Sequence, residues 1–252
     1  MNYIIIDQGT SSTKIFLFNN KGTILYKNKI KHKINTPKPF NIEFDPLEIV
    51  SAIKKLIFEV LKISKSINSA GLAIQRSTFL FWEKTTKKAL TPAISWQDSR
   101  AGHLLKEFDK NKKQIWEKTF TPLTPHFGGP KFVHIIRKNA SLKQAIKKGD
   151  VYFGPISAYI VHSLTGQAFI DQSIASRSLL FNIKKGKWSK YLLDLFDVPL
   201  KCLPPITPVQ FKFGNILKTK IPLSIVIGDQ QAALIGQGGV KKKYLGANLG
   251  TS

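Results

Sequence analysis

The chain has 252 residues, enough for one large domain or two small ones, and 42% hydrophobic residues suffice for a sizeable core. No run of 18 apolar residues occurs and the start lacks a signal-peptide pattern, so we expect neither a membrane span nor secretion. Because the single cysteine, Cys202, excludes an internal disulfide, we expect a reducing, cytoplasmic setting.

The formal net charge of +24 is extreme and leaves two readings open. It can reflect an anionic partner such as nucleic acid, or the lysine, isoleucine and asparagine bias of an AT-rich genome. The lysines are spread along the chain rather than gathered in one basic tract, so we favour bias and expect no nucleic-acid partner. Against this background the four arginines are informative, because arginine supplies a planar, multidentate donor that lysine does not.

The first third of the chain predicts strands followed by a helix. Strands are expected at residues 3–6, 14–18 and 23–27, with an Asn- and Gly-rich hairpin turn between the second and third. A helix is expected to begin at Asp45, with Asp45 as N-cap, proline at the first position and Glu48 completing a capping box.

The remainder alternates between strands and helices, which predicts the α/β class. Residues 71–74 read as a buried strand with residues 79–82 as its partner strand, and residues 90–96 as extended. The other expected elements are helices over 99–148 interrupted by a loop at 119–130, a strand at 151–153, a helix at 156–164 ended by Gly166, a strand at 221–227 and a helix from about residue 229.

The first chemical motif is Asp-Gln-Gly-Thr-Ser-Ser-Thr-Lys at residues 7–14, directly after the first strand. Gly9 lets the backbone approach a ligand, and the hydroxyl residues and turn amides that follow can cradle phosphate oxygens. Asp7 can hold Mg²⁺ through water, and Lys14 can neutralise phosphate charge. The alternative is an ordinary polar hairpin turn.

The second motif is Gly-Asp-Gln-Gln at residues 228–231, between an apolar strand and a helix. It places the Asp229 carboxylate at the carboxyl end of a strand, where α/β sheets bind ligands. Transfer of a phosphoryl group to an alcohol needs such a carboxylate to accept the hydroxyl proton. The alternative is a helix-capping aspartate.

Two further segments carry polar groups that suit a substrate or a nucleotide. Residues 75–78 (Gln-Arg-Ser-Thr), Trp82 and residues 96–100 (Trp-Gln-Asp-Ser-Arg) interleave hydrogen-bonding and aromatic side chains, which suits a polyol or, alternatively, a structural salt-bridge network. Residues 244–252 run into Gly250, Thr251 and a final serine, which favours a second phosphate-binding turn over a disordered tail.

Taken in their order along the chain, these motifs resemble the FGGY family of carbohydrate kinases, and within it the glycerol kinases most closely. Four further segments belong to the resemblance: Phe-Asp-Pro (44–46), Phe-Gly (153–154), Ala-Ser-Arg (175–177) and Leu-Phe-Asn-Ile (180–183). The resemblance implies an actin-like, hexokinase-like ATPase fold of the ribonuclease H type, of which this chain would be the N-terminal, substrate-binding lobe. It also implies ATP and Mg²⁺ as cofactors and transfer of the ATP γ-phosphate to a sugar or polyol hydroxyl.

The resemblance assigns roles to residues of this sequence. Asp229 would be the catalytic base and Asp7 would organise Mg²⁺ through water. The residues expected at the nucleotide phosphates are Gly9, Thr10, Ser11, Ser12, Lys14, Gly250 and Thr251. The residues expected at the substrate are Gln75, Arg76, Ser77, Trp96, His126, Asp229 and Gln230.

Two positions depart from the glycerol kinase pattern. Ser77 stands where those enzymes usually have Glu, and His126 stands where they usually have Tyr. Because each buried polar group left unpaired costs about 1–3 kcal/mol, these changes predict a larger sugar such as a ketose or pentitol rather than glycerol. His126 itself is either a substrate ligand or a packed loop residue.

The length is a third departure, because family members are roughly twice as long. We expect residues 1–245 to form the N-terminal lobe and residues 246–252 to begin the nucleotide lobe. The chain would then be a fragment, a truncated reading frame or half of a split enzyme, with a missing C-terminal lobe or a second copy completing the site. Alternatives to an enzyme lobe are a non-catalytic sugar-binding or regulatory remnant, and a nucleic-acid-binding protein.

Overall fold

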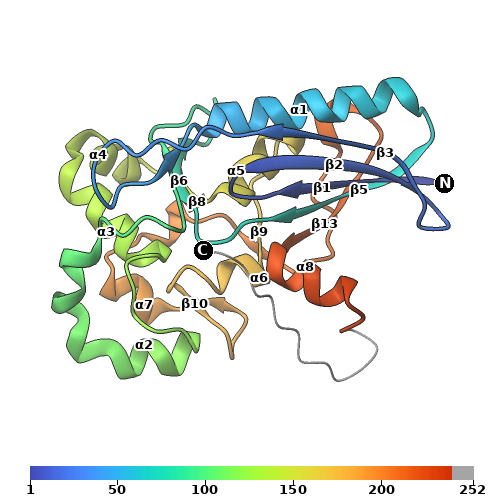
Figure 1. Ribbon diagram of the computed structural model, residues 1–252. Helices are drawn as coiled ribbons and strands as arrows, with labels where there is room; N and C mark the ends of the chain where they lie inside the picture. The colour runs from blue at the N-terminus through green and yellow to red at the C-terminus, as the bar shows by residue number, and fades with distance from the viewer. Residues whose placement is uncertain (240–252) are drawn as a thin grey trace.

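A mixed five-stranded sheet is the framework of the protein in the computed structural model, which describes residues 1–239. The strand order is β13-β5-β1-β2-β3, with β1–β2 and β2–β3 antiparallel and β1–β5 and β5–β13 parallel. Its strands are β1 (Asn2–Gln8), β2 (Ser12–Asn19), β3 (Ile24–Lys31), β5 (Ile67–Ile74) and β13 (Leu223–Gly228). This is the ribonuclease H-like arrangement that the family resemblance implied, and Figure 1 shows the strands side by side beneath α1.

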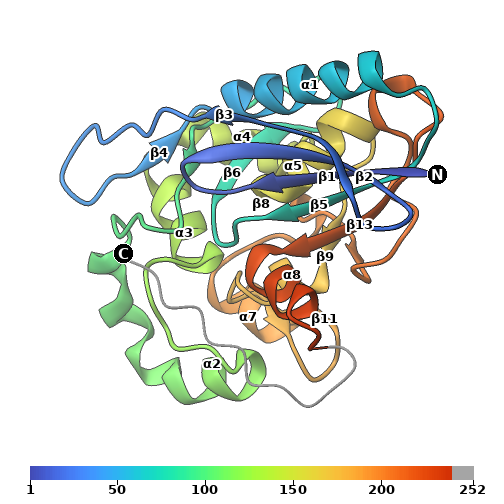
Figure 2. The same ribbon diagram turned by 45° about the vertical axis from the view of Figure 1, so that its right-hand side comes forward.

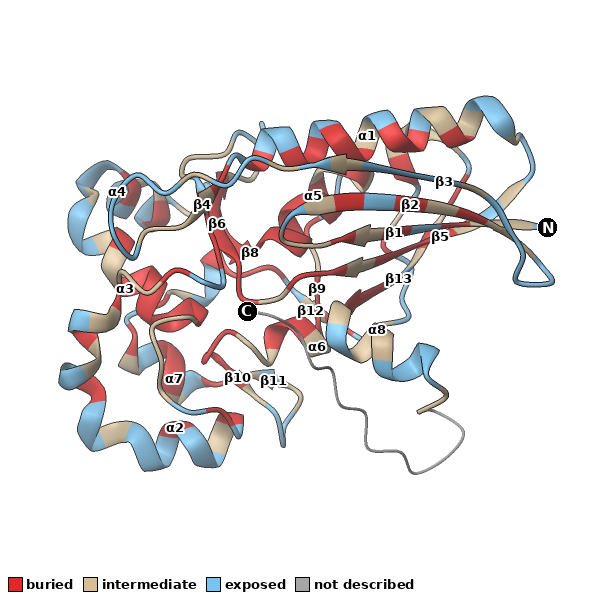
Figure 3. Cartoon of the chain, in the orientation of Figure 1, coloured by how far each residue is buried: buried red, intermediate tan, exposed pale blue. Residues whose placement is uncertain are grey.

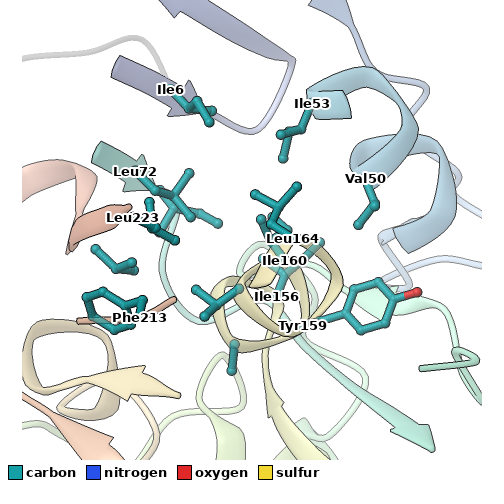
Figure 4. Packing of buried hydrophobic residues seen from close by; sticks show 14 of the residues in the cluster. Ile6, Val50, Ile53, Leu72, Ile156, Tyr159, Ile160, Leu164, Phe213 and Leu223 are labelled. Atoms are coloured by element: carbon teal, nitrogen blue, oxygen red, sulfur yellow. The ribbon is translucent and has the colours of Figure 1, made fainter. Parts of the chain in front are cut away.

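Two helices cover one face of this sheet, α1 (Pro46–Ile63) and α5 (Ile156–Thr165). Figure 4 shows their apolar side chains meeting those of the strands, with Ile6 from β1, Leu72 from β5, Leu223 from β13, Ile53 from α1 and Ile156 and Ile160 from α5. Figure 3 shows buried residues along β1, β2, β5 and β13 and on the inner stripe of α1, whereas β3 and the outer stripe of α1 are largely exposed.

The start of α1 confirms one half of the predicted capping box. The Asp45 side chain accepts the Leu47 N–H at 2.8 Å, and Pro46 occupies the first turn. The other half is wrong: the Glu48 carboxylate accepts the Lys33 N–H at 3.1 Å instead of bonding the cap residue. A tertiary donor competes successfully with the local one here.

A second sheet stands beside the first, in the order β4-β7-β6-β8. It consists of β4 (Glu43–Phe44), β6 (Phe79–Glu83), β7 (Ala93–Ile94) and β8 (Val151–Pro155). The predicted pairing of residues 71–74 with 79–82 is therefore wrong, since β6 pairs with β7 and β8. The turn between β5 and β6 redirects the chain, with Ser77 in the left-handed region at φ 62°.

The second sheet packs against a mainly helical region with its own apolar core, which includes Phe79, Phe81, Phe132 and Phe153. Its helices are the 3₁₀ segment η1 (Gly102–Asn111), α2 (Lys112–Thr119), α3 (Gly128–Lys138), α4 (Ala140–Lys148) and α7 (Lys190–Leu195). Helix α3 begins inside the predicted loop at 119–130. A Cβ at Gly129 would lie 2.7 Å from the Phe196 ring, so the sequence places glycine where α3 approaches that ring.

The remaining elements connect these parts. They are β9 (Ile170–Asp171), α6 (Gln172–Ala175), β10 (Phe181–Asn182), β11 (Lys187–Trp188), η2 (Leu200–Cys202), β12 (Ile206–Thr207), η3 (Ile216–Lys218) and α8 (Asp229–Gly236). Helix α8 follows β13 on the side of the first sheet away from α1 (Figure 2). Within residues 1–239, no helix is both long and apolar enough to cross a membrane. The predicted phosphate turn at Gly250 and Thr251 and the domain start at 246 lie outside the described residues.

Candidate active site

Three of the predicted motifs meet at one edge of the first sheet. The parallel strands β1, β5 and β13 end in register, because Gln8 pairs with Ile74 and Ile74 pairs with Gly228. The chain therefore leaves this edge with residues 9–12, residues 75–78 and α8 next to one another. Carboxyl ends of parallel strands form the usual ligand crevice of an α/β sheet.

A pocket of about 240 Å³ opens at this edge. Its walls combine residues from the three motifs with Arg177 from elsewhere in the chain. The lining residues are Thr10, Gln75, Arg76, Ser77, Trp96, Arg177, Asp229 and Gln230. The structure thus brings together every predicted substrate residue except His126, and adds Thr10 from the predicted phosphate motif.

Asp229 is the acidic group of the pocket and the first residue of α8. Its Oδ1 accepts the N–H of Gln230 at 2.7 Å and lies 3.4 Å from Nε of Arg76. Burial raises the pKa of Asp229 above its ordinary value, and the Asp7 carboxylate adds to this, while the Gln230 N–H and Arg76 oppose it. A carboxylate with raised proton affinity beside a cationic hydrogen-bond donor suits general base chemistry.

The phosphate motif forms the tight connection between β1 and β2. The Gly9 N–H donates to the Ser12 carbonyl at 3.0 Å, and the exposed Ser11 accepts the His32 N–H through its carbonyl at 2.9 Å. Asp7 and Lys14 face each other across the two strands, with Nζ 3.0 Å from Oδ2.

Thr10 connects the phosphate motif to the substrate wall. The indole N–H of Trp96 donates to Oγ1 of Thr10 at 2.9 Å. Trp96 keeps 39% of its surface exposed, so its ring flanks the pocket instead of filling the core. A flat apolar surface beside polar donors is what a polyol carbon chain requires.

For residues 75–78, Trp82 and 96–100 the sequence allows either a polyol site or a structural salt-bridge network, and the structure divides them between the two. Arg76, Ser77 and Trp96 line the pocket, whereas Asp98 is fully buried and bonds Arg100, which also contacts Glu43 at 2.7 Å. That second group is a structural salt-bridge network. Trp82 is also structural, since it is fully buried and its indole N–H donates to Nδ1 of His162 at 3.0 Å.

Gln75 and His126 support the pocket walls. Gln75 is buried, donates to Oε1 of Gln8 at 3.3 Å and accepts the Thr78 hydroxyl at 3.1 Å. His126 does not line the pocket, and its Nδ1 lies 3.0 Å from the Trp96 carbonyl. A direct contact between His126 and substrate stays a prediction.

Arg177 is the pocket residue that the sequence prediction missed. Its guanidinium lies 4.5 Å from the centre of the Phe127 ring, and burial together with neighbouring Arg76 lowers its pKa. The available signal was its residue type, an arginine in a lysine-rich chain and within a recognised motif. The pocket therefore holds two guanidiniums and one carboxylate.

Comparison with known proteins agrees with this geometry. The family model for the N-terminal domain of the FGGY family of carbohydrate kinases matches residues 2–236. Glycerol kinase 1 of Thermotoga maritima is 34% identical over 263 aligned positions that cover all of this chain and 54% of that protein. A probable glycerol kinase of Caenorhabditis elegans is 36% identical, over 92% of this chain and 49% of the relative.

Solved structures show the same fold. The glycerol kinase of Plasmodium falciparum with ADP superposes with a TM-score of 0.89 at 32% identity, covering 94% of this chain and 50% of that one. A xylulose kinase of Lactobacillus acidophilus superposes at 0.83 with 22% identity and thus supports the fold alone. The chain spans about half the length of the relatives it matches. With the family match covering most of its length, the chain belongs to the FGGY family of carbohydrate kinases, whose N-terminal domain it carries.

Proposed function

We propose that this chain binds a sugar or polyol and supplies the catalytic base of an ATP-dependent carbohydrate kinase. The observation that carries the proposal is the position of Asp229, a carboxylate of raised pKa in the same pocket as Arg76 and Thr10. In the proposed reaction, the substrate hydroxyl oxygen attacks the γ-phosphorus of ATP while Asp229 accepts the hydroxyl proton, and ADP leaves. The Arg76 and Arg177 guanidiniums and the Gln230 side chain hold the other hydroxyls.

The nucleotide side of the site is proposed on the β1–β2 connection. Lys14 and the backbone around Gly9, Thr10, Ser11 and Ser12 would face the phosphates. The carboxylate of Asp7 would hold Mg²⁺ through water, and such sites are commonly one or two carboxylates with water and phosphate. When bound, Mg²⁺ would neutralise phosphate charge. Among the described residues no group of three or more acidic, His or Cys side chains is placed to hold a metal ion.

The substrate is proposed to be a pentitol or ketose rather than glycerol. Similar proteins are named glycerol kinases, yet Ser77 leaves the pocket wall with a short neutral side chain where a carboxylate is usual in those enzymes. Replacing Ser77 with Glu is expected to raise turnover of glycerol relative to xylitol. An unchanged ranking of the two substrates would argue against Ser77 as a specificity residue.

The proposal includes a second, nucleotide-binding lobe, because the chain spans about half of its relatives. We propose that residues 1–245 form the substrate lobe and that residues 246–252 begin the second lobe, the rest of which would come from a longer chain or a partner chain. A cytoplasmic setting is proposed as well, on the single cysteine, which is buried. A sugar-binding protein without kinase activity is the second candidate, supported by the same pocket.

The decisive experiment measures ADP formation with Mg²⁺-ATP and a panel of glycerol, pentitols and ketoses, alongside calorimetric binding of each compound without ATP. Sugar-dependent ADP release supports the kinase, and the panel identifies the substrate. Binding without ADP release supports either the sugar-binding candidate or a kinase that lacks its nucleotide lobe. Adding a complementary C-terminal lobe distinguishes these two, because it restores ADP release only in the second case. Neither binding nor release from the chain with that lobe present would overturn both.

A further inference from the structure

The side chain of Lys131, in α3, is fully buried although it carries an ammonium group. Within the described residues it has no carboxylate within ion-pair distance. Nζ instead donates to main-chain carbonyls, at 2.6 Å to Ser95 and 2.7 Å to Ser77, with the Ile94 carbonyl at 3.5 Å. Lysine is almost never fully buried without a compensating partner, so these carbonyls must provide the compensation.

The two carbonyls at short distance belong to two separate segments of the chain that form walls of the pocket. Ser77 lines the pocket from the turn after β5, with the uncommon φ of 62°. Ser95 directly precedes Trp96, whose ring flanks the pocket. Residues 77 and 95 lie just beyond the β6–β7 ladder, whose register ends at the pair Phe79 and Ile94. Lys131 therefore joins the two walls at the point where strand pairing stops.

A second buried polar group makes the same connection. The Thr78 hydroxyl accepts the Trp96 N–H at 3.2 Å and donates to Oε1 of Gln75. This bond fixes the main chain of Trp96, while Lys131 fixes the carbonyl before it and the carbonyl of Ser77. Burial lowers the pKa of Lys131 to about 7, with Asp98 opposing and Arg100 adding to the shift. At this pKa the buried amine is held less firmly in its charged form than an exposed lysine is.

We propose that Lys131 is a positioning residue that holds Ser77 and Trp96 at the separation the substrate requires. The proposal rests on the proposed function, because the pocket is taken to be the polyol site. Lys131 does not line the pocket and acts through the two main-chain carbonyls. Without the ammonium, Ser77 loses the bond that favours its left-handed conformation and the loop before Trp96 loses its anchor.

The test compares Lys131→Met with Lys138→Met, which removes an exposed lysine from the same helix. Trp96 is observed by ¹⁹F NMR of 5-fluorotryptophan protein, its resonance assigned through Trp96→Phe. Affinities for glycerol and xylitol are measured by calorimetry, well below the melting temperature. Loss of the Lys131 hydrogen bonds in Lys131→Met is expected to shift or broaden the Trp96 resonance. It is also expected to weaken polyol binding by about 10-fold, since a small misplacement of binding groups is costly. Lys138→Met is expected to change neither.

A rescue variant separates positioning from general destabilisation. Lys131→Met is expected to weaken polyol binding less in a Ser77→Gly background than in the wild type, because glycine adopts a positive φ without strain. If Lys131→Met does not fold, Lys131→Gln replaces it; because its shorter side chain keeps two amide donors, a smaller shift of the Trp96 resonance and a smaller loss of affinity are expected. A folded variant with wild-type Trp96 signal, or with a changed signal and wild-type polyol affinity, overturns the proposal. If the wild-type protein binds no glycerol, pentitol or ketose of the panel, the proposed function fails, and the Trp96 signal alone still decides whether Lys131 holds this wall.

Discussion

Arg76 reaches Asp229 across the backbone of Gly228. Nε of Arg76 lies 3.4 Å from Oδ1 of Asp229, and a Cβ built on Gly228 would lie 2.7 Å from Cδ of Arg76 and 2.6 Å from Oε1 of Gln231. The glycine has an ordinary negative φ of −62°, so its backbone conformation does not require glycine. The absence of a side chain is what allows the guanidinium to approach the carboxylate.

This relationship predicts the effect of Gly228→Ala. The added methyl is expected to displace the Arg76 side chain and lower polyol affinity by about 10-fold, the scale of a misplaced charged hydrogen bond. Calorimetric binding measures it. Gly236→Ala is the matched control, because that glycine is also in α8 and has nothing within 4 Å of the added Cβ. Equal affinities of the two variants would show that the close approach over Gly228 is irrelevant to binding.

Asp229→Asn tests the proposed base. The amide keeps the shape of the side chain but cannot accept a proton, so phosphoryl transfer is expected to fall about 10²–10⁴-fold while polyol binding changes little. The measurement is ADP formation beside calorimetry, on protein supplied with its nucleotide lobe. Transfer at the wild-type rate would remove Asp229 from the mechanism.

Arg177→Met tests the pocket residue that the sequence left unassigned. Removal of a partly buried guanidinium that lines the pocket is expected to weaken polyol binding by about 10-fold, as for a hydrogen bond to a charged group. Arg137→Met serves as the control. Arg137 lies near the end of α3, is exposed and bonds Glu107 of η1. If both substitutions leave binding unchanged, Arg177 acts only through its stacking on Phe127.

The buried contact between Trp82 and His162 predicts a pH-dependent stability. Burial lowers the pKa of His162 to about 4, so between pH 4 and 6.5 the unfolded chain binds more protons than the folded chain. The stability from this group is complete above pH 6.5 and decreases as the pH falls toward 4, by up to about 3 kcal/mol.

His162→Gln keeps an acceptor for the Trp82 indole and removes the titration. The difference between the two unfolding curves at each pH isolates His162, which matters because other groups titrate in the same window. His134, whose pKa is lowered to about 4, acts in the same direction, while Asp171, raised to about 6, acts in the opposite one. A difference that stays constant from pH 7 to pH 4 would contradict the assignment.

Much of the site was predictable from local sequence. Gly9, Arg76 and Asp229 each follow an apolar strand, and the rule that parallel strands present their carboxyl ends at one edge suffices to expect them together. The N-cap at Asp45 and the end of α5 at Gly166 were also read correctly, because both depend on a few neighbouring residues. The assigned roles of these site residues remain predictions.

The errors share a physical cause. The pairing of β6 with β8, the Glu48–Lys33 bond and the contacts that bring Arg177 into the pocket join residues far apart in the chain. Lys131 is the clearest case, since an isolated lysine in a lysine-rich sequence carries no local mark of its burial. The sequence alone determined the α/β class, the order of motifs and the positions of Asp229 and Arg76 at strand ends, because hydrophobic period and turn chemistry are local. Only the tertiary structure decided which walls face each other and which buried donors hold them, because those contacts arise when the two sheets pack.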